Sequence, residues 1–77
     1  MEVVLYSAEW CPWCQMTKKF LKEHNIKFRE VNVDKDPEGA MEMIEKTGQM
    51  GVPVTIVDGK VIIGYDVKKL KEALNIK

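Results

Sequence analysis

The chain has 77 residues, of which 45% are hydrophobic, and its twelve basic and twelve acidic side chains leave no formal net charge. This length suits one small domain, which we expect to span residues 1–77, and the apolar content is too high for a disordered chain. The balanced charge argues against a nucleic-acid partner, and because no apolar run approaches ~18 residues we also expect no membrane span and no membrane partner.

The first third of the chain predicts a strand followed by a helix. Residues 3–6 form a short apolar run typical of a buried strand, and residues 7–10 are expected to form a loop. A helix is predicted from Pro12 to about Asn25, because proline suits a first helical turn and asparagine suits a left-handed cap. Its predicted buried stripe is Met16, Phe20, Leu21 and His24, with Lys18, Lys19, Lys22 and Glu23 on the polar side.

The middle of the chain predicts a second strand and a second helix. Residues 27–33 partly alternate between polar and apolar, which indicates a strand. The helix is expected to start with Asp36 as N-cap and Pro37 in its first turn, and to end at Gly48. Gly39 lies inside this helix, where glycine is unfavourable. The predicted buried stripe is Met41 and Ile44, with Met43 as a further candidate.

The last third contains the clearest local pattern. Residues 54–57 and 60–63 are rich in β-formers and are joined by Asp58-Gly59, which predicts a tight hairpin with positive φ at the turn. Asp66 is the expected N-cap of a last helix, with a buried stripe formed by Val67, Leu70, Ala73 and Leu74. The order β-α-β-α-β-β-α predicts an α/β fold in which helices flank a mixed four-stranded sheet.

The two cysteines of the chain lie in the stretch Trp10-Cys11-Pro12-Trp13-Cys14. Cys11 is expected where a strand ends and a helix begins, so that free backbone N–H groups and the helix dipole would stabilise its thiolate. We therefore predict that Cys11 is an exposed nucleophile that forms a mixed disulfide with a partner. Cys14, one turn further and more buried, would attack that disulfide and release the partner.

The residues around the cysteines have separate expected roles. Pro12 removes an N–H and stiffens the first turn, and Trp13 is expected to be an exposed contact surface beside the thiolate. Trp10 is expected to pack instead. Far along the chain, Pro53 stands directly before an apolar strand, where it cannot donate to a sheet. Either a cis Val52–Pro53 bond or a trans proline that opens the strand would explain it.

Taken together, these features resemble the thioredoxin superfamily and, more closely, the glutaredoxins. The resemblance rests on Tyr6-Ser7, Cys11-Pro12-Trp13-Cys14, Val52-Pro53 and Gly64-Tyr65-Asp66. It implies a thioredoxin fold and a thiol–disulfide oxidoreductase that reduces protein disulfides or glutathione mixed disulfides through its two cysteines. It also implies no metal and no tightly bound cofactor, with glutathione as a candidate co-substrate.

The same resemblance implies roles for residues outside the cysteine motif. Pro53 should be cis and lie beside the cysteines, and the backbone of Val52 should pair with the main chain of the substrate. Gly64, Tyr65 and Asp66 match the stretch that binds the γ-glutamyl end of glutathione.

Three departures from common glutaredoxin residues leave the electron donor open. Ala8 stands where glutaredoxins commonly have a lysine that can meet a carboxylate of glutathione, and Gly51 and Ile63 replace a threonine and a glycine. Such features also resemble the glutaredoxin-like redoxins that take electrons from thioredoxin reductase and serve ribonucleotide reductase. Disulfide-containing proteins are the expected substrates, with glutathione or thioredoxin reductase as electron donor.

Metal binding is the main competing interpretation. A C-x-x-C motif between a strand and a helix also suits a soft-metal carrier such as a copper chaperone, but the predicted element order and Pro12 favour a redox motif. A zinc site would need four ligands, and His24 is expected to be structural. An iron–sulfur-bridging dimer with glutathione is a further alternative. The methionines at 16, 41, 43 and 50 are expected to fill the core.

The start of the chain bears on location. Residues 1–6 lead directly into strand-like sequence with no basic, apolar leader, so we expect a cytoplasmic protein. Because thiols are kept reduced there, a lasting structural disulfide is not expected. We also expect a monomer.

Overall fold

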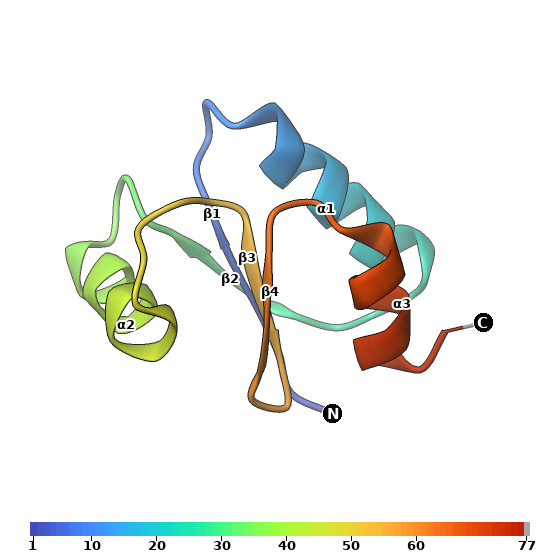
Figure 1. Ribbon diagram of the computed structural model, residues 1–77. Helices are drawn as coiled ribbons and strands as arrows, with labels where there is room; N and C mark the ends of the chain where they lie inside the picture. The colour runs from blue at the N-terminus through green and yellow to red at the C-terminus, as the bar shows by residue number, and fades with distance from the viewer. Residues whose placement is uncertain (77) are drawn as a thin grey trace.

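A four-stranded mixed sheet forms the centre of the computed structural model, which describes residues 1–76 (Figure 1). The strands lie in the order β2-β1-β3-β4; β1 is parallel to β2 and antiparallel to β3, and β3 is antiparallel to β4. The elements are β1 (Val3–Ser7), α1 (Pro12–Glu23), β2 (Arg29–Asn32), α2 (Pro37–Thr47), β3 (Val54–Val57), β4 (Lys60–Ile63) and α3 (Val67–Leu74). This element order is the predicted one.

The sheet is covered on both faces, with α1 and α3 on one side and α2 on the other (Figure 1). Side chains of β1 alternate between these faces, because successive residues of a strand point in opposite directions. Val3 and Leu5 pack with Phe20 and Leu21 of α1 and with α3. Val4 and Tyr6 instead form the core on the α2 side, together with Met43 and strands β2 and β3. A strand buried on both faces explains the continuous apolar run at residues 3–6.

A polar contact ties α2 to the sheet. The buried hydroxyl of Tyr6 donates a hydrogen bond of 2.6 Å to Glu42, and Arg29 approaches the same carboxylate oxygen at 3.1 Å. Burial and the neighbouring carboxylate raise the pKa of Tyr6 to about 12. Hydrogen bonds from Tyr6 and then Arg29 lower the pKa of Glu42. The contact therefore stabilises a neutral phenol against an ionised carboxylate.

The predicted helix and turn signals are confirmed. The Asp36 carboxylate accepts the Gly39 N–H at 3.0 Å, and the Asp66 carboxylate accepts the Lys69 N–H at 3.1 Å, so each aspartate caps its helix. Gly48 ends α2 in the left-handed region with φ 73°. The β3–β4 turn has positive φ at both central residues, 48° at Asp58 and 86° at Gly59, which is the geometry of a tight hairpin.

Several predictions of buried side chains are wrong. Met16, Met41 and Met50 are 44%, 57% and 74% exposed, and of the four methionines expected in the core Met43 is buried. His24 is also exposed, at the end of α1. The buried face of α1 is Cys14, Thr17, Phe20 and Leu21, so the predictions for Phe20 and Leu21 are confirmed. Cys14 and Thr17 complete this face in place of Met16 and His24, because the position of the sheet decides which neighbouring positions of the helix are covered.

Gly39 is required by the packing of α2 on β2. A β-carbon at this position would overlap Cγ1 of Val31 and would lie 2.9 Å from the Asp36 carboxylate. Val31 is buried, and its branched side chain has few alternative rotamers. The glycine that is unfavourable for an isolated helix is therefore the residue that allows this helix to approach the sheet. No helix within residues 1–76 has the length and apolarity needed to cross a membrane.

Replacing Gly39 by alanine should destabilise the protein. Helix propensity alone would favour alanine by about 1 kcal/mol, but the added methyl group must displace Val31 and the capping aspartate, and such overpacking costs about 1 to 3 kcal/mol. Urea unfolding of Gly39→Ala beside the wild type measures the difference. A variant more stable than the wild type would contradict this account of α2 packing.

Candidate functional site

Cys11 caps the N-terminus of α1. It follows the loop after β1 and has the extended backbone typical of an N-cap, with φ −92° and ψ 108°. Its Sγ accepts the backbone N–H of Cys14 at 3.1 Å, and its own N–H is donated to Ala8 at 3.3 Å. The sulfur thus receives the hydrogen bond that a serine or aspartate oxygen usually receives in this place.

The prediction that Cys11 is exposed is wrong, because the residue is only 3% exposed. The Cys11 side chain turns back toward the first turn of α1 to contact the Cys14 N–H, and its sulfur also lies 3.9 Å from the carbonyl oxygen of Val52. Cys11 and Cys14 pack together with Ala8, and Val33 and Val52 border this small cluster. A reacting group must therefore reach Cys11 between surrounding side chains.

Cys14 is completely buried, as predicted, and differs electrostatically from a free thiol. Burial, followed by the interaction with Cys11, raises its pKa to about 12. The backbone of Ala8 and the positive charge of Lys18 oppose this effect but do not outweigh it. Cys14 is therefore a neutral thiol at neutral pH.

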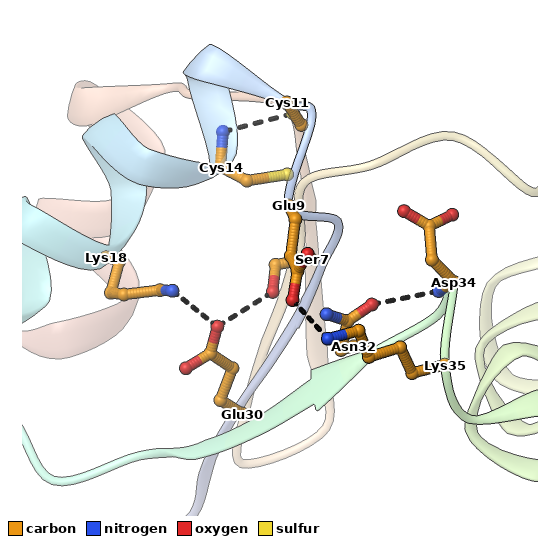
Figure 2. A network of polar contacts seen from close by, with 9 residues as sticks. All are labelled: Ser7, Glu9, Cys11, Cys14, Lys18, Glu30, Asn32, Asp34 and Lys35. Atoms are coloured by element: carbon orange, nitrogen blue, oxygen red, sulfur yellow. Dashed lines mark hydrogen bonds and ion pairs between the residues drawn. The ribbon is translucent and has the colours of Figure 1, made fainter.

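A polar network lies near Cys14, between α1 and β2 (Figure 2). Lys18 forms a 2.6 Å ion pair with Glu30, and the Ser7 hydroxyl donates to the same carboxylate oxygen at 3.0 Å. Although partial burial opposes it, hydrogen bonds from Lys18 and Ser7 lower the pKa of Glu30. Lys18, placed by the sequence pattern on the polar side of the helix, is part-buried in this network. The spacing of four residues between Cys14 and Lys18 could have indicated this position, because residues four apart lie on the same face of a helix.

The segment opposite the cysteines carries the cis Val52–Pro53 bond that the resemblance implies. The Pro53 carbonyl accepts the Gly64 N–H at 2.8 Å, which joins this segment to the turn before α3. Immediately before it, the side-chain amide of Gln49 binds both backbone groups of Gly51, at 2.8 Å to the N–H and 3.0 Å to the carbonyl. Residues 49–53 are therefore held by hydrogen bonds within the segment and by the bond from Gly64.

An open hollow of about 300 Å³ lies beside this segment and is lined by Trp13, Val52, Pro53, Gly64 and Tyr65. Trp13 is 59% exposed, as predicted, and its ring stacks on that of Tyr65 with centroids 6.2 Å apart. The structure thus brings together the predicted site residues from three separate stretches. Asp66 does not line the hollow, because its carboxylate caps α3.

Trp10 is not packed, contrary to prediction. It is 70% exposed, and the loop that carries it, between β1 and α1, extends past the end of the sheet (Figure 1). Both tryptophans around Cys11 are therefore surface residues. Within residues 1–76, no group of three or more histidine, cysteine or acidic side chains comes together in a way that could hold a metal ion.

The strand order, the cysteine pair at the start of α1 and the cis proline opposite define a thioredoxin-fold redox protein. A mutant of the thioredoxin-like protein BC3987 is 30% identical, with a TM-score of 0.94 over 99% of this chain and 97% of that chain. A sequence model of the glutaredoxin family matches residues 3–62. The chain belongs to the glutaredoxin family.

Proteins similar in sequence include glutaredoxin-like proteins and a glutaredoxin. A glutaredoxin-like 8.6 kDa protein of the rubredoxin operon in Clostridium pasteurianum, described as uncharacterized, is 44% identical over 83% of this chain and 85% of its own length. The glutaredoxin-like protein NrdH of Lactococcus lactis (strain MG1363) is 40% identical over 82% and 86%. Glutaredoxin 3 of Escherichia coli (strain K12) is 33% identical over 83% and 77%.

The raised pKa of Cys14 predicts an alkaline loss of stability in the reduced protein. Its pKa is about 12 in the fold against an ordinary value of 9.0, so the unfolded chain loses this proton at a lower pH than the folded one. The contribution of the protonated Cys14 thiol to the free energy of unfolding is complete below about pH 9 and is lost as pH rises through about 12.

Urea unfolding of the wild type and of Cys14→Ser, both fully reduced, tests this at neutral pH and at about pH 10. The wild type should lose more stability than the variant between the two conditions. Tyr6 and the lysines are common to both proteins and cancel in the comparison. Equal losses would contradict the assignment of a buried, neutral Cys14.

Proposed function

We propose that the protein is a thiol–disulfide oxidoreductase that reduces disulfides through Cys11 and Cys14. The observation that carries this proposal is the 3.1 Å hydrogen bond from the Cys14 N–H to the Cys11 sulfur, made at the N-terminus of a helix. In the proposed reaction this N–H would donate to the Cys11 sulfur as it attacks, and the helix holds the second cysteine one turn away. Membership of the glutaredoxin family supports the same activity.

The first step is attack of the Cys11 thiolate on one sulfur of a substrate disulfide. A bond forms between Cys11 and that sulfur, the substrate S–S bond breaks, and the other substrate sulfur leaves as a thiolate that takes up a proton. Cys14 then gives up its proton and attacks the Cys11 sulfur; the bond between Cys11 and the substrate breaks, and the remaining substrate sulfur leaves as a thiolate that takes up a proton. The products are a Cys11–Cys14 disulfide and a fully reduced substrate, so two electrons pass from protein to substrate.

The contrast between the two thiols supports this division of roles. Cys14 has no exposed surface and a pKa raised by burial, so it is a poor competitor for an incoming disulfide. Cys11 borders Val52, which lines the open hollow. We propose that the hollow holds the substrate beside the sulfur, with the Val52 backbone pairing with substrate main chain and the Trp13 and Tyr65 rings as contact surface.

We propose glutathione as a co-substrate and no tightly bound cofactor. A second candidate, a hydrogen donor for ribonucleotide reductase that is itself reduced by thioredoxin reductase, is favoured by one observation. The Gly64 N–H, a candidate donor to the γ-glutamyl end of glutathione, is already bonded to Pro53. A cytoplasmic location and a monomeric state accompany both proposals, since a reducing compartment would regenerate the dithiol.

Single cysteine substitutions test the two-step reaction. Cys11→Ser should abolish reduction of a disulfide substrate such as insulin, because the first nucleophile is missing. Cys14→Ser should stop at the mixed disulfide, which non-reducing mass spectrometry detects as an adduct on Cys11. If Cys14→Ser reduces protein disulfides at the wild-type rate, the two-thiol mechanism is wrong.

The electron donor is tested by supplying each reducing system separately to the oxidised protein. In one assay NADPH and glutathione reductase regenerate glutathione, and in the other NADPH and thioredoxin reductase act directly. Turnover in the glutathione assay, followed by NADPH absorbance, is the result expected for the first candidate. Turnover confined to thioredoxin reductase would exclude it and support the second.

A further inference from the structure

A second hollow shares one lining residue, Val52, with the first. It has a volume of about 240 Å³, and its apolar lining includes Trp10, Met43, Ile44 and Met50. Val52 lines both hollows. Because the Val52 carbonyl oxygen is 3.9 Å from the Cys11 sulfur, a substrate joined to Cys11 lies within reach of both.

The wall of the second hollow is unusual for a protein surface. Trp10 and Met50 are 70% and 74% exposed, although both are large and apolar. Tryptophan and methionine are enriched at protein–protein contacts, and methionine adapts its shape to different apolar partners. The Gln49 amide also occupies both backbone groups of Gly51 at the edge of this hollow. Contact there is therefore made mainly through apolar side chains.

The charges around the hollow disfavour a small anionic substrate. Asp34 is its charged lining residue, and the nearby Lys35 is engaged in a 2.7 Å ion pair with Glu9 (Figure 2). Glutathione has two carboxylates, one ammonium group and no apolar side chain, so its net charge is negative, like that of Asp34, and it has no group that would cover the apolar wall. A polypeptide can bring an uncharged main chain and a large apolar side chain.

We propose that this second hollow binds an apolar side chain that neighbours the reactive cysteine in polypeptide substrates. The site thereby favours protein disulfides over glutathione mixed disulfides. This inference rests on the proposed function and specifies its substrate class. Trp13 and Trp10 then serve the two sides of one reaction centre, each lining a different hollow.

Two short peptides that differ at one residue test the proposal. Each carries one cysteine joined by a disulfide to a thionitrobenzoate group, and the residue beside the cysteine is leucine in one peptide and serine in the other. Attack by Cys11 on the peptide sulfur releases the coloured thiol. We expect kcat/KM for the leucine peptide to exceed that for the serine peptide roughly tenfold, as burial of one such side chain allows.

Variants of the hollow should remove this preference. In Trp10→Ser and in Met50→Ser the ratio between the two peptides should fall toward one. Met41→Ser is the matched control, because Met41 is also an exposed methionine, 57% exposed, but does not line the hollow. This variant should keep the wild-type ratio.

The outcomes separate this inference from the proposed function. If no peptide is reduced, the oxidoreductase proposal fails. If both peptides are reduced equally well, or if Met41→Ser loses the preference as fully as Met50→Ser, the oxidoreductase proposal stands and the second hollow is not a substrate site. The glutathione conjugate of the same coloured thiol should react with a kcat/KM no higher than that of the serine peptide, and a higher value would also overturn the inference.

Discussion

The hydrogen bond between the Cys14 N–H and the Cys11 sulfur depends on where β1 ends and α1 begins. It requires a helix that starts at Pro12, directly after a strand buried on both faces, because only then does Cys11 occupy the N-cap. That strand is fixed in place because Val3 to Tyr6 fill two separate cores. The chemistry proposed for the site is therefore set by backbone geometry that the sheet imposes.

The remaining contacts make the two thiols unequal. Cys14 is directed into the molecule and is surrounded by apolar groups, with the Lys18–Glu30 pair as the nearby charged network (Figure 2). Cys11 is nearly as well covered, yet it borders Val52, which faces two hollows. A burial difference of a few per cent would not distinguish the cysteines. Their different positions relative to these surface hollows do.

Local sequence signals predicted most of the fold. The capping aspartates, the left-handed Gly48 and the Asp58-Gly59 turn depend on interactions within a few residues, so their positions could be inferred without a structure. The buried face of α1 could be inferred only in part: Phe20 and Leu21 were predicted, but the burial of Thr17 in place of Met16 depends on how the helix lies on the sheet. The need for Gly39 was hidden for a similar reason, since it arises from Val31 in another element.

The sequence indicated which residues form the candidate site, but not how exposed each of them is. The cysteine spacing and the distant Val-Pro pair identified residues that the structure brings together. Burial of Cys11 and exposure of Trp10 follow from how one loop passes the end of the sheet, which no periodicity encodes. Lys18 was missed because a lysine on a helix is usually solvated, and its partner Glu30 lies on β2.

The Gln49 side chain has a broader effect on recognition. By satisfying both polar groups of the Gly51 backbone, it takes the place that a neighbouring strand would fill and shortens the free edge next to the cis proline. In the proposed reaction, an incoming chain would then find backbone partners at Val52 but not one residue earlier. Such a truncated edge would offer little main-chain affinity for extended polypeptides in general, which is also how proteins limit indiscriminate strand addition.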